Sequence, residues 1–243
     1  MALDHVFVLC AEGAPEAARL IARGLVEGSP NRHPGQGTAC RRFFFANAYL
    51  ELLFVVDEAE ARAEPARATR LFERWSRRRT GASPFGIVLR PADRAAESAA
   101  DIPLGGRRPA DDAGASDGAT AASAPPFHTW SYRPPYLPPD FSIEVATGTP
   151  LAEPEILYIP FARRPDRIGR EPITHGIPAA EITAVGIGVP GLGARSAAAR
   201  AVEEIGAVAF APADDHLMTL TFDGGGRGAG DDLRPELPVV LRW

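Results

Sequence analysis

Runs of apolar residues divide the first part of the chain into predicted strands and helices. Four segments are rich in β-branched and aromatic side chains, which is typical of strands: 3–10, 39–46, 48–57 and 83–91. Residues 14–25 carry apolar side chains at the spacing of one helical face, and residues 64–79 predict a second helix. The segment after the first helix predicts a loop or a short strand, so residues 1–57 predict a βαβββ unit.

The later part of the chain repeats this order of predicted elements. Further strands are predicted at 127–134, 153–161, 181–190, 216–224 and 237–243, with a helix at 196–207. Residues 98–126 are rich in Ala, Gly, Asp, Ser and Pro and predict a flexible insertion. Because weak internal repetition implies duplicated units, we expect a paired βαβββ domain over 1–165. An additional C-terminal βαββ-like half module is expected over 166–243.

Composition narrows the classes of function. The chain has 243 residues, 45% of them hydrophobic, and a formal net charge of −5, which gives no reason to expect binding to nucleic acid or to an anionic membrane surface. All 26 basic residues are arginines, which excludes a Schiff-base lysine and a lysine-dependent phosphate loop. Since no dinucleotide-binding glycine pattern is present either, we expect no nucleotide cofactor.

The cysteines and the N-terminus predict a reduced, cytoplasmic protein. No stretch approaches the roughly 18 uninterrupted apolar residues of a membrane helix, and no basic region followed by a long apolar run opens the chain. Cys10 and Cys40 form neither a metal-type spacing nor a disulfide framework. Cys40 lies beside two arginines that could lower its thiol pKa, but strand alternation makes it equally a small core residue.

The stretch RHPGQGT, residues 32–38, has two interpretations. Its glycines and its proline suit a tight turn at the entry to a strand. Alternatively, it faces a substrate, with His33 and Gln36 offering polar atoms. Arg41 and Arg42 follow on opposite faces of the predicted strand, so only one can face a cavity. We take Arg41 as the candidate clamp for an anionic substrate group.

The predicted strand at 127–134 offers a second group of candidate substrate contacts. His128, Trp130 and Tyr132 share one face of it, an arrangement that suits an apolar pocket with polar tips. Packing of the sheet against a helix explains the same pattern. We keep His128 and Trp130 as candidate substrate-binding residues.

Glu51 is the most informative polar residue, because its strand is otherwise apolar. Burial of an unpaired carboxylate is costly, so such a group usually has a metal, a cationic partner or a raised pKa. Glu51 therefore either belongs to a site or pairs with Arg41 or Arg42 on the neighbouring strand. His5 alone fits a hydrogen-bonded core histidine as well as it fits a ligand.

The motifs LDHV on the first strand and YLELL on the fourth, in a repeated βαβββ unit, resemble the vicinal oxygen chelate superfamily. More narrowly, RHPGQGT followed by AYLELL, and the later THGIPAAEITAVGIGV, are similar to glyoxalase-like domain proteins. The resemblance implies an α+β fold whose repeated βαβββ modules form curved mixed sheets around a cavity. It also implies a divalent metal (Zn, Fe, Mn or Ni) held by the first and fourth strands of each module.

Mapped onto this chain, the resemblance implies His5, Glu51 and Glu155 as metal ligands, with Glu153 as the alternative to Glu155. The ligand position on the first strand of the second module falls on Gly86, which has no side chain that could bind a metal. His128 could complete the set if its strand brings it inward.

The implied function is a small-molecule enzyme whose metal chelates two substrate oxygens, with lyase, isomerase or dioxygenase-type chemistry. Glu51 and Glu155 are the candidate catalytic residues, either of which could carry a proton. The alternative is a metal-free protein that binds and sequesters a small molecule, as bleomycin-resistance proteins do, and the gap at Gly86 favours it. A third interpretation is a degenerate site with a role in assembly. We expect a small-molecule ligand, no nucleic acid or membrane partner, and allow for a homodimer.

Overall fold

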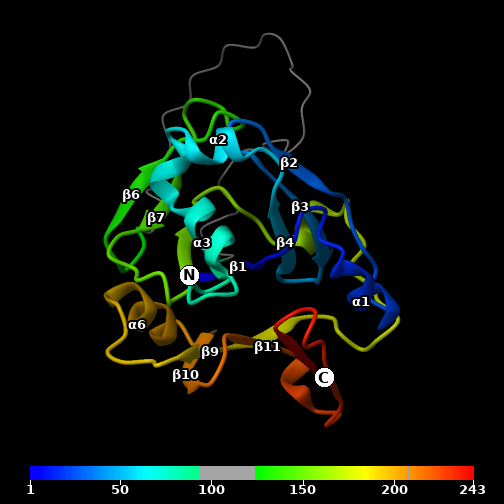
Figure 1. Ribbon diagram of the computed structural model, residues 1–243. Coiled ribbons are helices and arrows are strands. Elements are labelled where there is room, and N and C mark those ends of the chain that lie inside the picture. Colours follow the sequence, from blue (N-terminus) through cyan, green and yellow to red (C-terminus); the bar gives the residue numbers. More distant parts are fainter. Residues whose placement is uncertain (93–123, 207) are drawn as a thin grey trace.

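A computed structural model describes residues 1–92, 124–206 and 208–243 (Figure 1). The first of its two sheets has eight strands in the order β2-β3-β4-β1-β5-β8-β7-β6. The strands of its first half are β1 (Ala2–Leu9), β2 (Asn31–His33), β3 (Thr38–Phe44) and β4 (Tyr49–Val55), with helix α1 (Ala17–Ala22) after β1. Those of its second half are β5 (Phe85–Arg90), β6 (Thr129–Tyr132), β7 (Ile143–Ala146) and β8 (Glu155–Tyr158).

The two halves of this sheet share one pattern of strand pairing. In each half the first strand pairs in parallel with the fourth, β1 with β4 and β5 with β8. The two first strands, β1 and β5, pair antiparallel at the centre and join the modules. The predicted α+β fold of repeated modules in curled mixed sheets is confirmed. Most of the predicted insertion at 98–126 lies outside the described residues.

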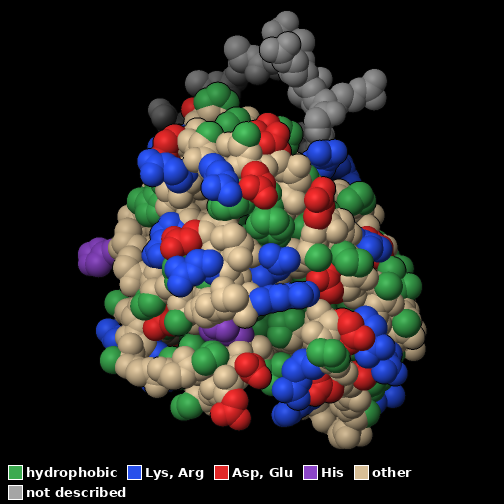
Figure 2. All heavy atoms as spheres, viewed as in Figure 1, with side chains coloured by type: hydrophobic (Ala, Val, Ile, Leu, Met, Phe, Trp, Pro, Cys, Tyr) green, Lys and Arg blue, Asp and Glu red, His purple; other side chains and the backbone are tan. Residues whose placement is uncertain are grey.

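The segment between β4 and β5 differs from the single helix predicted at 64–79. It forms α2 (Glu58–Arg62), a 3-10 turn (Ala66–Thr69) and α3 (Leu71–Arg77). Asp57 caps α2 by accepting a hydrogen bond from the backbone N–H of Glu60. Arg70 interrupts the helical path because its backbone is left-handed, with φ of 62°. Arginine and carboxylate side chains are interspersed on the face that Figure 2 shows. Within the helical segment, Arg62 pairs with Glu58 and Arg77 with Glu73.

The second sheet has the strand order β10-β9-β11-β13-β12 and lies below the first in Figure 1. Its elements are β9 (Ile182–Pro190), α6 (Ala197–Glu204), β10 (Val208–Ala213), β11 (Leu217–Phe222), a 3-10 turn (Asp223–Gly225), β12 (Gly230–Asp232) and β13 (Val239–Arg242), after the short helix α5 (Pro165–Ile168). The sequence predicted β9, β11, β13 and α6 but not β10 and β12. In this sheet both missed strands are edge strands, and β10 contains Pro212, which an edge tolerates because one row of backbone N–H groups there is unpaired. In the first sheet the sequence also missed β7, which lies between β6 and β8.

The eight-stranded sheet has two different faces. One face packs into the main hydrophobic core, which extends from Val6 and Leu50 in the first sheet to Val185 and Leu220 in the second. The other face, here called the site face, carries His5, Phe7, Glu51 and Glu155, together with a smaller apolar cluster. That cluster comprises Phe7, Leu9, Cys40, Leu53, Leu71 and Val88. Within the described residues, no helix has the length and apolarity needed to span a bilayer.

The junction of the two modules depends on one glycine. Phe7 of β1 is paired with Gly86 of β5, and the Phe7 ring covers the glycine so closely that a Cβ there would lie 1.9 Å from Phe7 Cε1. The absence of a side chain at position 86 therefore makes room for the ring. Gly86 is a packing requirement of this fold.

We predict that Gly86→Ala destabilises the protein by about 1–3 kcal/mol, because the new methyl group overpacks the ring of Phe7. Urea denaturation measures the loss. In a Phe7→Leu background the same substitution should cost much less, since the clash is with the ring.

Gly186→Ala in β9 is the matched control, because its Cβ would meet nothing closer than 3.5 Å. Equal losses for Gly86→Ala in the two Phe7 backgrounds would contradict the interpretation.

Candidate functional site

Strand register places the two predicted catalytic carboxylates on one row across the site face. Glu51 of β4 is paired with Phe7, Phe7 with Gly86, and Gly86 with Glu155 of β8. The row spans β4-β1-β5-β8, so the backbones of Glu51 and Glu155 are separated by about 14 Å along the sheet. The ring of Phe7 lies between them above Gly86. Both carboxylates are buried, at 6% and 4% exposure.

Glu51 is bound on one side by His5. The imidazole Nε2 of His5 lies 3.3 Å from Glu51 Oε2, and its Nδ1 lies 2.6 Å from Asp4 Oδ2. A register shift between Leu3 and His5 lets Asp4 and His5 approach the same buried region. The ring of His5 also stacks on Tyr49, with centroids 4.2 Å apart.

The buried charges of this group stabilise each other. Burial alone lowers the pKa of His5, but hydrogen bonds to the carboxylates of Asp4 and Glu51 outweigh it and raise the pKa to about 9. Burial alone raises the pKa of Glu51, but the hydrogen bond and charge of His5 outweigh it and lower the pKa to about 2. At neutral pH the pair is therefore an imidazolium beside a carboxylate.

On its other side Glu51 faces donors from β2 and β3. One ligand atom each from His33, Cys40 and Glu51 lies within 4.8 Å of the other two. Cys40 is buried and His33 half-buried, and the Cys40 thiol shares a hydrogen bond with Glu51. These three residues form a group that could hold a metal ion. Glu155, a predicted ligand, lies outside this group, across Phe7.

Gln36 connects this group to the second module. Its side-chain N–H donates to Thr38 Oγ1 at 2.9 Å, and Thr38 Oγ1 lies 2.9 Å from His33 Nδ1. The hydroxyls of Tyr132 and Tyr136 both donate to Gln36 Oε1, at 3.1 and 3.3 Å. The loop at 32–38 is thus both a turn and part of the buried polar network.

Glu155 has a different environment. Burial raises the pKa of its carboxyl to about 7, and the smaller effect of the nearby Arg74 guanidinium opposes this rise. Glu155 Oε2 has no hydrogen-bond partner among the described residues. The guanidinium of Arg74 is itself buried and donates to the carbonyl oxygens of Pro150, Leu151 and Glu153. The carboxyl of Glu155 therefore changes its protonation near neutral pH.

The remaining predicted residues lie outside this group. Arg41 is on the opposite face, where it makes two hydrogen bonds to Glu27. Arg42 is opposite Glu51 in the strand register, but its guanidinium binds Ser29. The alternative of a Glu51–arginine ion pair is therefore not what the structure shows: the cation beside Glu51 is His5.

Two further candidates come from the start of β6. His128 is exposed and precedes β6, whereas Trp130 is half-buried and packs edge-on against Tyr132, with centroids 5.8 Å apart. Their roles in substrate binding, like that of Arg41, stay predictions.

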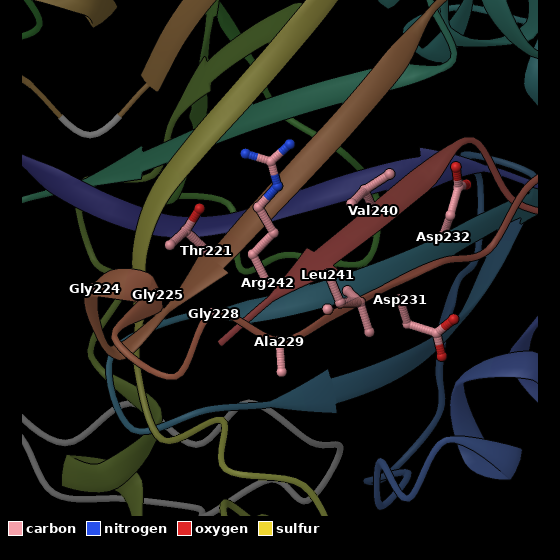
Figure 3. Close-up of a pocket in the computed structure, with 11 residues that line it drawn as sticks. Thr221, Gly224, Gly225, Gly228, Ala229, Asp231, Asp232, Val240, Leu241 and Arg242 are labelled. Carbon is pink, nitrogen blue, oxygen red and sulfur yellow. The ribbon is translucent and has the colours of Figure 1, made fainter.

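Two surface hollows lie away from this group. One, of about 540 Å³, is on the second sheet, between the glycine-rich turn after β11 and strands β12 and β13 (Figure 3). It is lined by residues that include Thr221, Gly224, Asp231, Asp232 and Arg242. Another lies near Asn47 and Arg90. Neither hollow is lined by His5, Glu51 or Glu155, so the titratable groups define the candidate site better than surface shape does.

Sequence reasoning gave too little weight to several residues of the site. Arg74 belongs to an arginine-rich helix end that predicts a solvated terminus, yet it is 3% exposed because α3 packs it over the loop before β8. The partners of Cys40 could not be identified from the sequence, because His33 and Glu51 come close to it only when β2, β3 and β4 pair. The role of Asp4 could have been predicted from the sequence, because an acidic residue next to His5 can orient its ring.

The fold and site together define a two-module protein of the vicinal oxygen chelate type. A protein-family model described as a glyoxalase-like domain matches residues 3–203, from β1 to the end of α6. The chain belongs to this glyoxalase-like domain family. A search of curated proteins finds no match.

The His5–Glu51 pair gives a testable pH dependence in metal-free protein. The raised pKa of His5 stabilises the fold fully below about pH 6.5, and this contribution is lost as the pH rises towards 9. The lowered pKa of Glu51 stabilises the fold above about pH 4.5, and that contribution is lost as the pH falls towards 2.

We predict that Asp4→Asn lowers the His5 pKa by at least about one unit, measured by NMR titration of the ring.

The resonances of His128, which is exposed, serve as the internal control in that titration. An unchanged His5 pKa in Asp4→Asn would contradict the role of Asp4.

Glu155 gives a second prediction, because its ionisation opposes folding whereas the ionised forms of His5 and Glu51 favour it. Because its folded pKa is raised to about 7, ionisation opposes folding, and stability falls as the pH rises from about 4.5 through 7. Glu155→Gln should remove this fall and be more stable than wild type at pH 8 by up to about 3 kcal/mol, with little difference at pH 4. Chemical denaturation at the two pH values measures it.

Asp140→Asn, at an exposed carboxylate, is the control. Parallel pH profiles for wild type and Glu155→Gln would show that Glu155 is ionised normally.

Proposed function

We propose that the protein is a glyoxalase-like enzyme that binds a small molecule at the site face and acts on it with a divalent metal held at Glu51. The observation that carries this proposal is the buried contact of Glu51 with His5, backed by Asp4. A carboxylate and an imidazole on adjacent strands are ligands that Zn, Fe, Mn or Ni accept. Domains of this superfamily commonly bind small molecules, which supports the same class of ligand.

The chain's own residues would have distinct tasks. A bound metal would supply Lewis-acid polarisation of the substrate oxygens. Asp4 accepts from His5 Nδ1 and so directs Nε2 towards Glu51, as second-shell carboxylates do for histidine ligands. In metal-free protein His5 carries a proton, which a metal would displace, so metal binding should release protons.

Glu155 suits the task of carrying a proton. Its pKa of about 7 lets it donate or accept near neutral pH, whereas Glu51 stays ionised. Two carboxylates with pKa values that their environments separate are suited to different roles, one as a proton carrier and one as a fixed charge. Lyase, isomerase and dioxygenase-type reactions are all compatible with this division.

A metal-free binding protein is the second candidate. Phe7 covers Gly86, so the second module offers no ligand at that position. The apolar cluster of Phe7, Leu53 and Val88 on the same face favours contact with an aromatic or aliphatic ligand. Among the described residues both cysteines are free thiols, which supports a reducing, cytoplasmic setting for either function. A homodimer is proposed for either.

Metal analysis of purified protein tests the proposal. We predict stoichiometric metal in wild type and its loss in Glu51→Gln and His5→Gln, because each removes a ligand. Glu27→Gln removes a carboxylate on the opposite face and should retain the metal.

Retention of metal by both ligand variants would contradict the proposal. Wild type that stays metal-free after reconstitution, but is stabilised in a thermal-shift screen by small molecules, would establish the metal-free alternative.

A further inference from the structure

The donors around Glu51 define a metal site that differs from a set shared between two modules. His33 comes from β2, Cys40 from β3 and Glu51 from β4, three neighbouring strands of the first module. The second module contributes nothing to this group, because Phe7 fills the space above Gly86 and Glu155 lies beyond it. A metal bound at Glu51 is therefore surrounded by first-module donors.

We propose that the first module alone binds Zn²⁺ through the imidazole of His33, the thiolate of Cys40 and the carboxylate of Glu51, with one coordination position left for a substrate oxygen. This inference rests on the proposed function in one respect, that a metal is held at Glu51. It replaces His5 as a ligand by His33 and Cys40, keeps His5 as the partner that orients Glu51, and through the thiolate names the class of metal.

The geometry suits such a site after a small contraction. The three donor atoms lie within 4.8 Å of one another. In a tetrahedral zinc site with bonds of 2.0–2.3 Å the ligand atoms are about 3.3–3.8 Å apart. From the upper bound of 4.8 Å, a contraction of about 1 Å brings the donors to that separation.

The chemistry of the donors selects the metal. A nitrogen, a sulfur and an oxygen ligand match Zn²⁺, whereas Mg²⁺ and Ca²⁺ prefer oxygen ligands alone. Three protein ligands with a fourth position open are the pattern of catalytic rather than structural zinc. The thiol of Cys40, which shares a hydrogen bond with Glu51, would release its proton to solvent on becoming the ligand.

A second shell already holds these ligands. His33 Nδ1 is bonded to Thr38 and Nε2 to Asn31, so whichever ring nitrogen takes the metal, the other keeps a partner. Thr38 is in turn held by Gln36. On the other side of Glu51, His5 approaches at 3.3 Å and fixes the carboxylate. This buried network gives the site a preformed orientation.

Cobalt substitution tests the inference, because a Co²⁺–thiolate bond gives a charge-transfer absorption that nitrogen and oxygen ligands do not. Co²⁺ is added to metal-free full-length protein, and Zn²⁺ affinity is measured by competition with a chromophoric chelator. We expect the thiolate band in wild type and its absence in Cys40→Ser, with Zn²⁺ binding weakened at least about 100-fold.

Cys10→Ser is the matched control, because Cys10 is the other buried free thiol and belongs to the main core. It should keep the band and the affinity. His33→Gln, at the half-buried member of the group, should keep the band but weaken Zn²⁺ binding, which provides a test if Cys40→Ser fails to fold.

The outcomes separate this inference from the proposed function. Metal bound without a thiolate band, or bound equally by wild type and Cys40→Ser, overturns the inference and leaves the metal-dependent function standing. No Co²⁺ or Zn²⁺ binding to wild type overturns both. A cysteine-dependent site in a protein that neither binds nor converts small molecules supports the inference and contradicts the function.

Discussion

The close packing of the Phe7 ring over Gly86 is the constraint on which the arrangement of this protein depends. The contact lies where β1 pairs with β5, and in the described sheet this pairing joins the two modules. A larger residue at position 86 would displace the ring, and a smaller one at position 7 would leave a cavity at the junction. Glu51 and Glu155 lie on the same row of the sheet. The ring of Phe7 lies between them, so the two carboxylates do not face a common metal site.

This separation gives the two carboxylates different physical chemistry. Glu51 has a protonated imidazole 3.3 Å away, and the hydrogen bond and charge of that ring outweigh the cost of burial. For Glu155 the charges of Arg74 and Arg70 lower the pKa by less than burial raises it, and the N–H groups of Arg74 are committed to backbone carbonyls, so burial decides its pKa. Glu51 is thus a fixed anion and Glu155 can carry a proton, although both are glutamates. Their pKa values differ because their neighbours on other strands differ.

The order of elements could be predicted from the sequence because strand and helix periodicities are local properties. The first module, strands β5, β6 and β8 of the second, strands β9, β11 and β13 and the position of α6 followed from apolar spacing, whereas β7 did not. The motifs LDHV and YLELL indicated the family that the match over residues 3–203 shows. What failed was also local in origin. Arg70 takes a left-handed backbone that divides the predicted helix, and the edge strands β10 and β12 carry too weak an apolar pattern to be seen.

By itself the sequence determined which residues are unusual: a histidine in the first strand, a glutamate in an apolar fourth strand, and a glycine where the related fold would place a ligand. Only the tertiary structure decided what each of them contacts. It joined Glu51 to His5 rather than to Arg41 or Arg42, brought Cys40 and His33 to the same carboxylate, and buried Arg74. The physical reason is that alternation fixes the face on which a side chain lies, whereas its partners depend on strand order and register, which long-range pairing sets.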